Sequence, residues 1–223
     1  MKQKKASSSP LLLAALTGGI ATGKSIAAGV LSDLGCFVAQ ADEAARAILA
    51  PGLPAWEAVV AHFGQGILNQ DRSIDRKRLG AIIFADEGER RFMNALIHPL
   101  VLADREKEIA RIRDAGTHKI YISEAALTIE AGYQGFFDKI IITHCLPAIQ
   151  IQRLMDRDGI RREDALKIIK SQMPQEDKLS YADYSINTSG NLRETVEQTE
   201  RIFRLLMQDY ELKAASSADE EPY

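Results

Sequence analysis

The chain has 223 residues, of which 46% are hydrophobic and 26% charged, with a formal net charge of −3 and a pI near 5.9. This length can bury a sizeable core, and the charge balance gives no overall basic excess for non-specific binding to nucleic acid. Cys36 and Cys145 lie far apart and form no CxxC or Cys/His cluster. Neither a zinc site nor a disulfide framework is therefore indicated, and we expect two buried thiols in a single compact body.

The first ten residues, MKQKKASSSP, precede an apolar run from Leu11 to Leu16. This run is short for the hydrophobic region of a signal peptide, and cleavage after it would destroy the glycine-rich loop that follows. We therefore expect a flexible arm over residues 1–10 and a cytoplasmic location in a reducing compartment. No other stretch approaches the length of a transmembrane helix. The polar, acidic end is expected to form a disordered tail over residues 211–223.

A glycine-rich motif follows the apolar run. From Gly18 to Ser25 the chain reads GGIATGKS, which matches G-x-x-x-x-G-K-[ST] at every fixed position. Glycines permit positive φ and close backbone approach, so successive N–H groups can face phosphate oxygens. Lys24 supplies a charge for the β- and γ-phosphates, and Ser25 offers a hydroxyl to Mg²⁺ at the start of a helix. The motif therefore predicts a phosphate-binding loop between a strand and a helix.

The helix after this loop is expected to bury Ile26, Val30 and Leu34 on one stripe and to end at Gly35. A short apolar segment over residues 36–39 is then expected to form a second strand. Alternating strand and helix patterns indicate an α/β fold with a parallel sheet, whose ligands bind at the carboxyl ends of the strands.

Asp42 and Arg46 follow the second strand, four residues apart. If a helix starts here, Asp42 caps it and both side chains point the same way. The carboxylate can then accept a proton from a substrate hydroxyl, while the arginine holds an anionic group. The alternative is an N-cap aspartate with a surface ion pair, which the spacing alone favours. The position at the carboxyl end of a strand makes the two interpretations about equal.

From Pro51 to Gly116 no strand pattern appears. The apolar periodicity instead predicts three helices, which contain the residues 56–63, 79–84 and 92–113. Pro99 is expected to kink the third helix or to divide it, and His98 alone is more typical of a packing residue than of a catalyst. A helical block of this kind, over about residues 43–116, is typical of a cap over a nucleotide site.

Strand patterns resume over residues 119–123 and 139–143, the second being a β-branched run. Between them lies Glu130, whose carboxylate is either a solvated loop charge or a group near an acceptor site, and its spacing does not decide between the two. A last short strand is expected over residues 184–187. The final helix is expected to pack one face on the sheet through the stripe Leu192, Val196, Thr199, Phe203 and Leu206.

A cluster of arginines lies between the last two predicted strands, on a helix beginning at Pro147 and on the segment after Gly159. The cluster consists of Arg153, Arg157, Arg161 and Arg162. Arginines on a segment hinged by a glycine are typical of a lid over polyphosphate. A solvated basic face is the alternative, but the phosphate loop favours a lid over about residues 148–173.

The chain resembles the dephospho-CoA kinases in the order and spacing of six segments: LTGGIATGKS, ADEAAR, ALIHPLV, IEAG, QRLMDRDGIRREDALKIIKSQMPQEDK and ADYSINTSG. The resemblance spans about Leu12 to Met207. It implies a P-loop kinase fold with about five strands, and phosphorylation of the ribose 3′-hydroxyl of dephospho-CoA in the last step of coenzyme A synthesis. The implied cofactors are ATP and Mg²⁺. No nucleic-acid or membrane partner is implied, and we expect a monomer or weak homo-oligomer.

The resemblance also assigns roles to individual residues. The implied ATP site comprises Gly19, Ala21, Thr22, Gly23, Lys24, Ser25, Ile26, Arg157 and Asn187, with Ser25 binding the metal. The implied acceptor side comprises Thr17, Asp42, Arg46, His98 and Glu130. Asp42 is implied as the base on the acceptor hydroxyl, with Lys24 and Arg153 as the other catalytic residues.

Three positions depart from the family pattern. Ile26 stands where a second hydroxyl is usual, Gln40 replaces the first carboxylate of D-A-D, and Ala126 replaces the proline of P-L-L-F-E. Two alternatives stay open. One is another P-loop kinase that acts on a nucleoside or nucleotide. The other, prompted by Gln40, is a nucleotide-binding regulatory protein that no longer catalyses.

Overall fold

The computed structural model describes residues 10–219, so the expected arm lies, apart from Pro10, outside the described residues. The chain divides into two compact units, and the second, Ala41–Arg111, interrupts the first. The single body expected from the length is therefore replaced by two units. The bounds of the second unit are close to those of the predicted helical block. Within residues 10–219, no helix is both long and apolar enough to cross a membrane.

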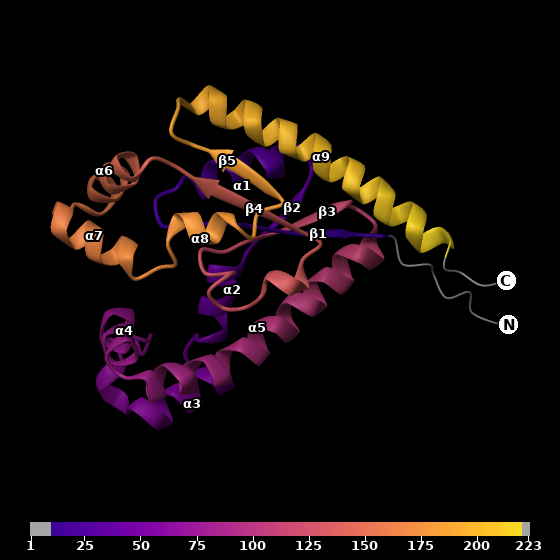
Figure 1. Cartoon of the computed structure of the whole chain (residues 1–223). Coiled ribbons are helices and arrows are strands. Elements are labelled where there is room, and N and C mark those ends of the chain that lie inside the picture. The colour runs from indigo at the N-terminus through magenta and orange to yellow at the C-terminus, as the bar shows by residue number, and fades with distance from the viewer. Residues whose placement is uncertain (1–9, 220–223) are drawn as a thin grey trace, which may run out of the picture. The chain divides into compact units, whose positions relative to one another are not determined.

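The first unit contains a five-stranded parallel sheet in the order β2-β3-β1-β4-β5. Its strands are β1 (Leu12–Gly18), β2 (Phe37–Gln40), β3 (Ile120–Glu124), β4 (Lys139–His144) and β5 (Tyr184–Asn187). The predicted α/β fold is confirmed, and each predicted strand is present with small shifts of its ends. The strand β1 lies in the middle of the sheet (Figure 1). It is almost entirely buried, which explains its continuous apolar sequence.

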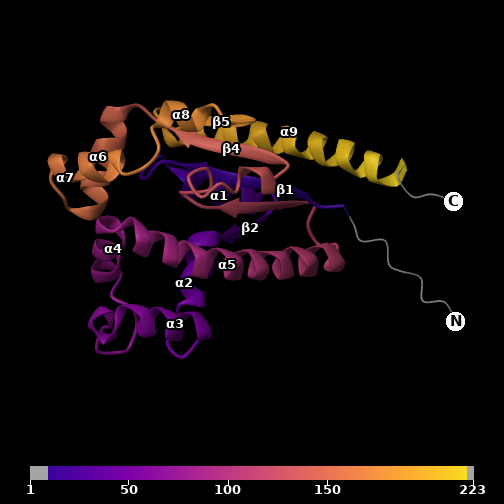
Figure 2. The same cartoon turned by 60° about the horizontal axis from the view of Figure 1, so that its bottom comes forward.

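The first unit also contains helices, most of which follow β4 in the chain. They are α1 (Lys24–Asp33), α6 (Pro147–Asp158), α7 (Arg162–Lys170), α8 (Gln175–Leu179) and α9 (Leu192–Asp219), with the short 3₁₀ helix η2 (Gln134–Phe136) before β4. One face of the sheet packs against α1 and α9 in the main core cluster. The other face packs against the connection between β3 and β4 and against α8. The helices α6 and α7 lie beyond the carboxyl ends of the strands (Figure 1, Figure 2).

The helix α1 packs through a different stripe from the predicted one. It buries Ala27, Ala28 and Leu31, whereas Ile26 is 39% exposed. Both stripes are apolar, and the stripe with two alanines is the one that meets the sheet, because small side chains let a helix lie close to the strands. The predicted end of this helix is confirmed, since Gly35 follows the C-cap with φ of +94°.

The helix α9 also differs from prediction in its buried face and its length. It buries Thr195, Thr199, Ile202 and Leu206, while Leu192 at its start is 62% exposed. The buried stripe is thus shifted at its beginning, although Thr199 and Leu206 were predicted. The helix continues to residue 219, so the disordered tail predicted over residues 211–223 is wrong for 211–219, and the last four residues lie outside the described range.

The second unit is helical, as predicted. It contains α2 (Ala41–Ile48), α3 (Pro54–Phe63), the 3₁₀ helix η1 (Gln65–Ile67), α4 (Arg76–Ala85) and most of α5 (Glu87–Ala115). Its core is formed by Val59, Ile67, Leu79 and Met93. The helix α5 runs without a break through Pro99, so the proline does not divide it.

The two cysteines give a test of this packing. Cys36 and Cys145 are buried, and burial raises the pKa of both thiols, that of Cys36 to about 12. Because the thiolate is the reactive form, the native protein at pH 8 is expected to react slowly with 5,5′-dithiobis(2-nitrobenzoic acid). In the unfolded protein both cysteines are expected to react promptly, which releases two equivalents of thionitrobenzoate per chain. Native thiols that react as fast as free cysteine would contradict the described packing.

Candidate active site

The glycine-rich loop joins β1 to α1 in the predicted strand–loop–helix arrangement. Gly23, with φ of +83°, is the N-cap of α1. The loop folds back on itself, since the N–H of Thr22 and its Oγ1 both donate to the carbonyl oxygen of Gly19, at 3.3 and 2.7 Å. Lys24 Nζ lies against the loop and donates to the carbonyl oxygen of Gly18 at 3.1 Å. The arrangement matches a helix N-terminus that binds phosphate.

The start of the loop packs closely against β4. A Cβ atom on Gly18 would lie 2.3 Å from Thr143 Oγ1 and 2.4 Å from the carbonyl oxygen of Thr143, and φ of Gly18 is +151°. Thr143 Oγ1 also shares a hydrogen bond of 2.8 Å with Thr22 Oγ1, and both side chains are buried. The side chain of Thr22 therefore stabilises the loop from inside, and only its backbone is available to a ligand.

The predicted lid arginines lie in two different environments. Arg153 on α6 donates to Thr188 Oγ1 at 2.9 Å and to the Thr188 carbonyl oxygen at 2.7 Å. Thr188 Oγ1 in turn donates to the carbonyl oxygen of Thr22 at 3.0 Å, so Arg153 is connected to the loop. Arg157 is exposed and pairs with Asp158 at 2.7 Å. Asn187 ends β5, and its Oδ1 accepts the N–H of Ser189 at 2.9 Å.

Two residues predicted on the acceptor side have structural partners in the first unit. The carboxylate of Glu130 lies 2.8 Å from Nζ of Lys178, which is only 1% exposed, and it accepts the N–H of Met173 at 3.2 Å. Thr17 is fully buried, and its hydroxyl donates to the carbonyl oxygen of Ala126 at 3.3 Å. Both residues hold the segment after β3, and their contact with a substrate stays a prediction.

Glu124, the last residue of β3, is not among the predicted site residues. It lies opposite Leu16 in the register between β3 and β1, so it stands on the edge of the sheet from which the loop leaves. A carboxylate at the end of a strand beside the loop strand was the available signal. With the exposed hydroxyl of Ser25 it offers the hard oxygen donors that Mg²⁺ prefers. Among the described residues, no group of three or more His, Cys, Asp or Glu side chains could hold a metal.

The second unit carries the other predicted acceptor residues. The helix α2 begins at Ala41, so Asp42 is in its first turn and is not the N-cap, contrary to prediction. Asp42 and Arg46 are both exposed, and their spacing puts them on one side of the helix. His98 lies within α5.

A cavity of about 670 Å³ in the second unit begins on the same side of α2. Its lining includes Ala45 and Arg46 of α2 and Leu49 directly after the helix, together with Asn69, Leu79 and Gly80. Ala45 and Arg46 lie three and four residues after Asp42, which puts the three on one side of α2. The cavity therefore adjoins the side of α2 that carries Asp42, the predicted base. Its walls are both apolar and charged.

A sequence profile described as dephospho-CoA kinase matches residues 12–194. The chain belongs to the dephospho-CoA kinase family. The dephospho-CoA kinase of Halalkalibacterium halodurans is 38% identical over 187 residues, covering 84% of this chain and 92% of that protein. The resemblance inferred from the six segments is thereby confirmed.

Solved structures share the fold of this chain. TT1252 from Thermus thermophilus matches with a TM-score of 0.77 and 25% identity, covering 86% of this chain and 96% of that one. The dephospho-CoA kinase from Campylobacter jejuni matches with a TM-score of 0.63 and 26% identity, covering 86% and 95%. The predicted P-loop kinase fold is therefore confirmed.

The contact at Gly18 leads to a testable prediction. Gly18→Ala is expected to abolish nucleotide binding and to lower the thermal midpoint, because its Cβ would overlap the backbone of β4. Gly29→Ala in α1 is the control, since a Cβ there meets nothing within 4 Å and an alanine inside a helix adds about 0.5–1 kcal/mol of stability. ATP titration calorimetry and thermal melts measure both effects. Parental ATP affinity in Gly18→Ala would show that the close approach is unimportant.

Proposed function

We propose that the protein transfers the γ-phosphoryl group of ATP to the ribose 3′-hydroxyl of dephospho-CoA, giving coenzyme A and ADP. The observation that carries this proposal is the formed loop Gly18–Ser25, with Lys24 Nζ held against it, in a chain of the dephospho-CoA kinase family. The name of the relative from Halalkalibacterium halodurans supports the same reaction.

The loop and its neighbours form the donor side in this proposal. The N–H groups of Gly19 and of Ala21 to Ser25, with the ammonium group of Lys24, bind the β- and γ-phosphates. The phosphate oxygens then replace the carbonyl oxygens of Gly18 and Gly19 as acceptors from Lys24 Nζ. Ser25 and Glu124 would hold Mg²⁺ directly or through water. When bound, the metal neutralises charge on the phosphates.

The arginine segment and the end of β5 complete the donor side. Arg157 pairs with Asp158 at the surface, and an exposed ion pair contributes little to stability. The guanidinium group of Arg157 can therefore turn from Asp158 to phosphate. Arg153 stabilises charge on the transferred phosphoryl group from its position beside Thr188. Asn187 borders the adenine pocket, and Ala21 and Ile26 contribute backbone and apolar contacts.

The second unit forms the acceptor side. Asp42 orients the ribose hydroxyl, Arg46 binds the diphosphate, and the cavity beyond it holds the pantetheine arm. Its volume of about 670 Å³ is typical of ligand sites, and its apolar and amide-bearing walls suit a chain that alternates methylene and amide groups. His98 of the second unit, and Glu130 and Thr17 of the first, are further acceptor-side residues in this proposal.

The reaction itself requires little covalent chemistry from the protein. The 3′-oxygen attacks the γ-phosphorus, the bond to the bridging oxygen of ADP breaks, and the hydroxyl proton passes to the Asp42 carboxylate. Positioning of the two substrates and neutralisation of charge supply most of the rate. The presence of Lys24, Ser25, Asp42 and Arg153 together favours a working enzyme over a non-catalytic regulatory protein.

We place this activity in the cytoplasm, in a monomer or weak homo-oligomer without a nucleic-acid partner. The net charge of −3 supports the last point, because it gives no general attraction to phosphate backbones. The two buried free thiols agree with a reducing compartment.

Two substitutions separate the proposed roles. Lys24→Ala is expected to abolish turnover, because the charge on the β- and γ-phosphates is then uncompensated. Asp42→Asn is expected to lower kcat by about 10²-fold or more with ATP affinity unchanged, since the amide cannot accept the proton. Steady-state kinetics and ATP calorimetry measure the two effects. An unchanged kcat in Asp42→Asn would remove the assignment of Asp42 as the base.

An acceptor panel separates the proposal from its alternatives. With Mg²⁺ and ATP, ADP release is expected to depend on dephospho-CoA and to be far slower with AMP or nucleosides. A preference for AMP or a nucleoside would identify another P-loop kinase. ATP binding without turnover on any acceptor would favour the regulatory protein.

A further inference from the structure

Two glutamines bind a single residue of the phosphate loop, Ile20. The N–H of Ile20 donates to Oε1 of Gln172 at 2.8 Å. The carbonyl oxygen of Ile20 accepts from Nε2 of Gln150, also at 2.8 Å. The donor and acceptor that Ile20 offers therefore fix the orientation of both side-chain amides.

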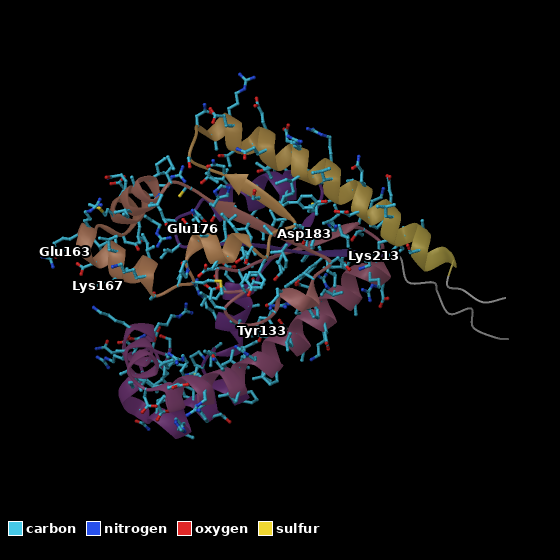
Figure 3. The ribbon with its side chains drawn as sticks, viewed as in Figure 1. Tyr133, Glu163, Lys167, Glu176, Asp183 and Lys213 are labelled. Atoms are coloured by element: carbon cyan, nitrogen blue, oxygen red, sulfur yellow. The ribbon has the colours of Figure 1, made fainter. Side chains whose placement is uncertain are left out.

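The two glutamines come from opposite ends of the arginine-bearing helical hairpin α6–α7. Gln150 lies in the first turn of α6 and is 7% exposed, and Gln172 follows Ser171, the C-cap of α7. The outer side of α7, with Glu163 and Lys167, faces solvent (Figure 3). The two ends of the α6–α7 hairpin thus both bind Ile20 of the phosphate loop.

Packing strengthens this attachment. Ile20 and Ala21 pack against a cluster formed by Ile151 and Leu154 of α6 and Ala165 of α7. The approach is close, since a Cβ on Gly19 would lie 2.9 Å from Nε2 of Gln150. Residues 19–21 of the loop therefore connect the α6–α7 hairpin to the phosphate site through close packing.

The next residue shows why the loop needs this support. Ala21 has φ of +59°, a left-handed conformation that is unfavourable for a residue with a Cβ. The hydrogen bonds of Gln150 and Gln172 fix both peptide groups of Ile20, and the second of these peptides leads into Ala21. They hold the backbone in the conformation that turns the following N–H groups of the loop toward phosphate.

The geometry points to Gln150 and Gln172 as positioning residues that set the affinity of the loop for the phosphates of ATP and couple it to both ends of the α6–α7 hairpin. This inference rests on the proposed function in taking ATP as the donor. It assigns the glutamines no contact with the phosphates, since they act through Ile20.

The test uses Gln150→Met and Gln172→Met, which keep side-chain length and remove the hydrogen bonds. Each is expected to raise the Kd for ATP about threefold to tenfold, the effect of one hydrogen bond, with the KM for dephospho-CoA and the thermal midpoint near parental values. In the double variant, the Kd for ATP is expected to rise by less than the product of the two single increases, because both glutamines act on Ile20. Gln152→Met is the control, since Gln152 is exposed on α6 and its side-chain amide donates to Asp156 on the same helix.

A rescue experiment separates positioning from a general loss of structure. Ala21→Gly removes the unfavourable Cβ at the left-handed position, so it is expected to restore most of the ATP affinity of Gln172→Met. Parental ATP affinity in both methionine variants would overturn the inference, as would an equal loss in Gln152→Met or the absence of rescue. Because ATP binding is measured directly, a parent protein that binds ATP but does not phosphorylate dephospho-CoA would overturn the proposed function alone.

Discussion

The packing of β4 against the end of β1 at Gly18 is the constraint on which the phosphate site depends. Thr143 occupies the space that a side chain at Gly18 would need, and its hydroxyl bonds to Thr22 inside the loop. From Thr22 the contacts continue through Thr188 to Arg153 on α6. A chain of buried and partly buried hydrogen bonds therefore links the sheet, the loop and the arginine segment.

The arginine segment has a second attachment to the sheet. Lys178 on α8 pairs with Glu130 and donates to the carbonyl oxygen of Ala126, and Glu130 also accepts the N–H of Met173. Burial of the Lys178 ammonium group has a desolvation cost, which the ion pair with Glu130 and these hydrogen bonds offset. With the glutamine contacts at Ile20, this pair fixes the base of the α6–α7 hairpin.

The strands and the phosphate loop were predictable because their signals are local. A β-branched run defines β4, and the motif from Gly18 to Ser25 fixes residue types at set spacings. The buried stripe of α1 was not predictable, because its sequence offers two apolar stripes and only the sheet selects between them. Likewise, Gln150 and Gln172 were missed because their partner Ile20 lies 130 and 152 residues away in sequence. No pattern within one segment can show such a contact.

In the proposed reaction, this loop delivers phosphate to one defined hydroxyl of one acceptor. Phosphorus NMR of the products formed from ATP, Mg²⁺ and dephospho-CoA measures that transfer. We expect a new phosphomonoester resonance on the ribose 3′-position, growing in equal amount with ADP and absent in Lys24→Ala. ADP formation without that resonance, or a phosphate on another hydroxyl, would contradict it.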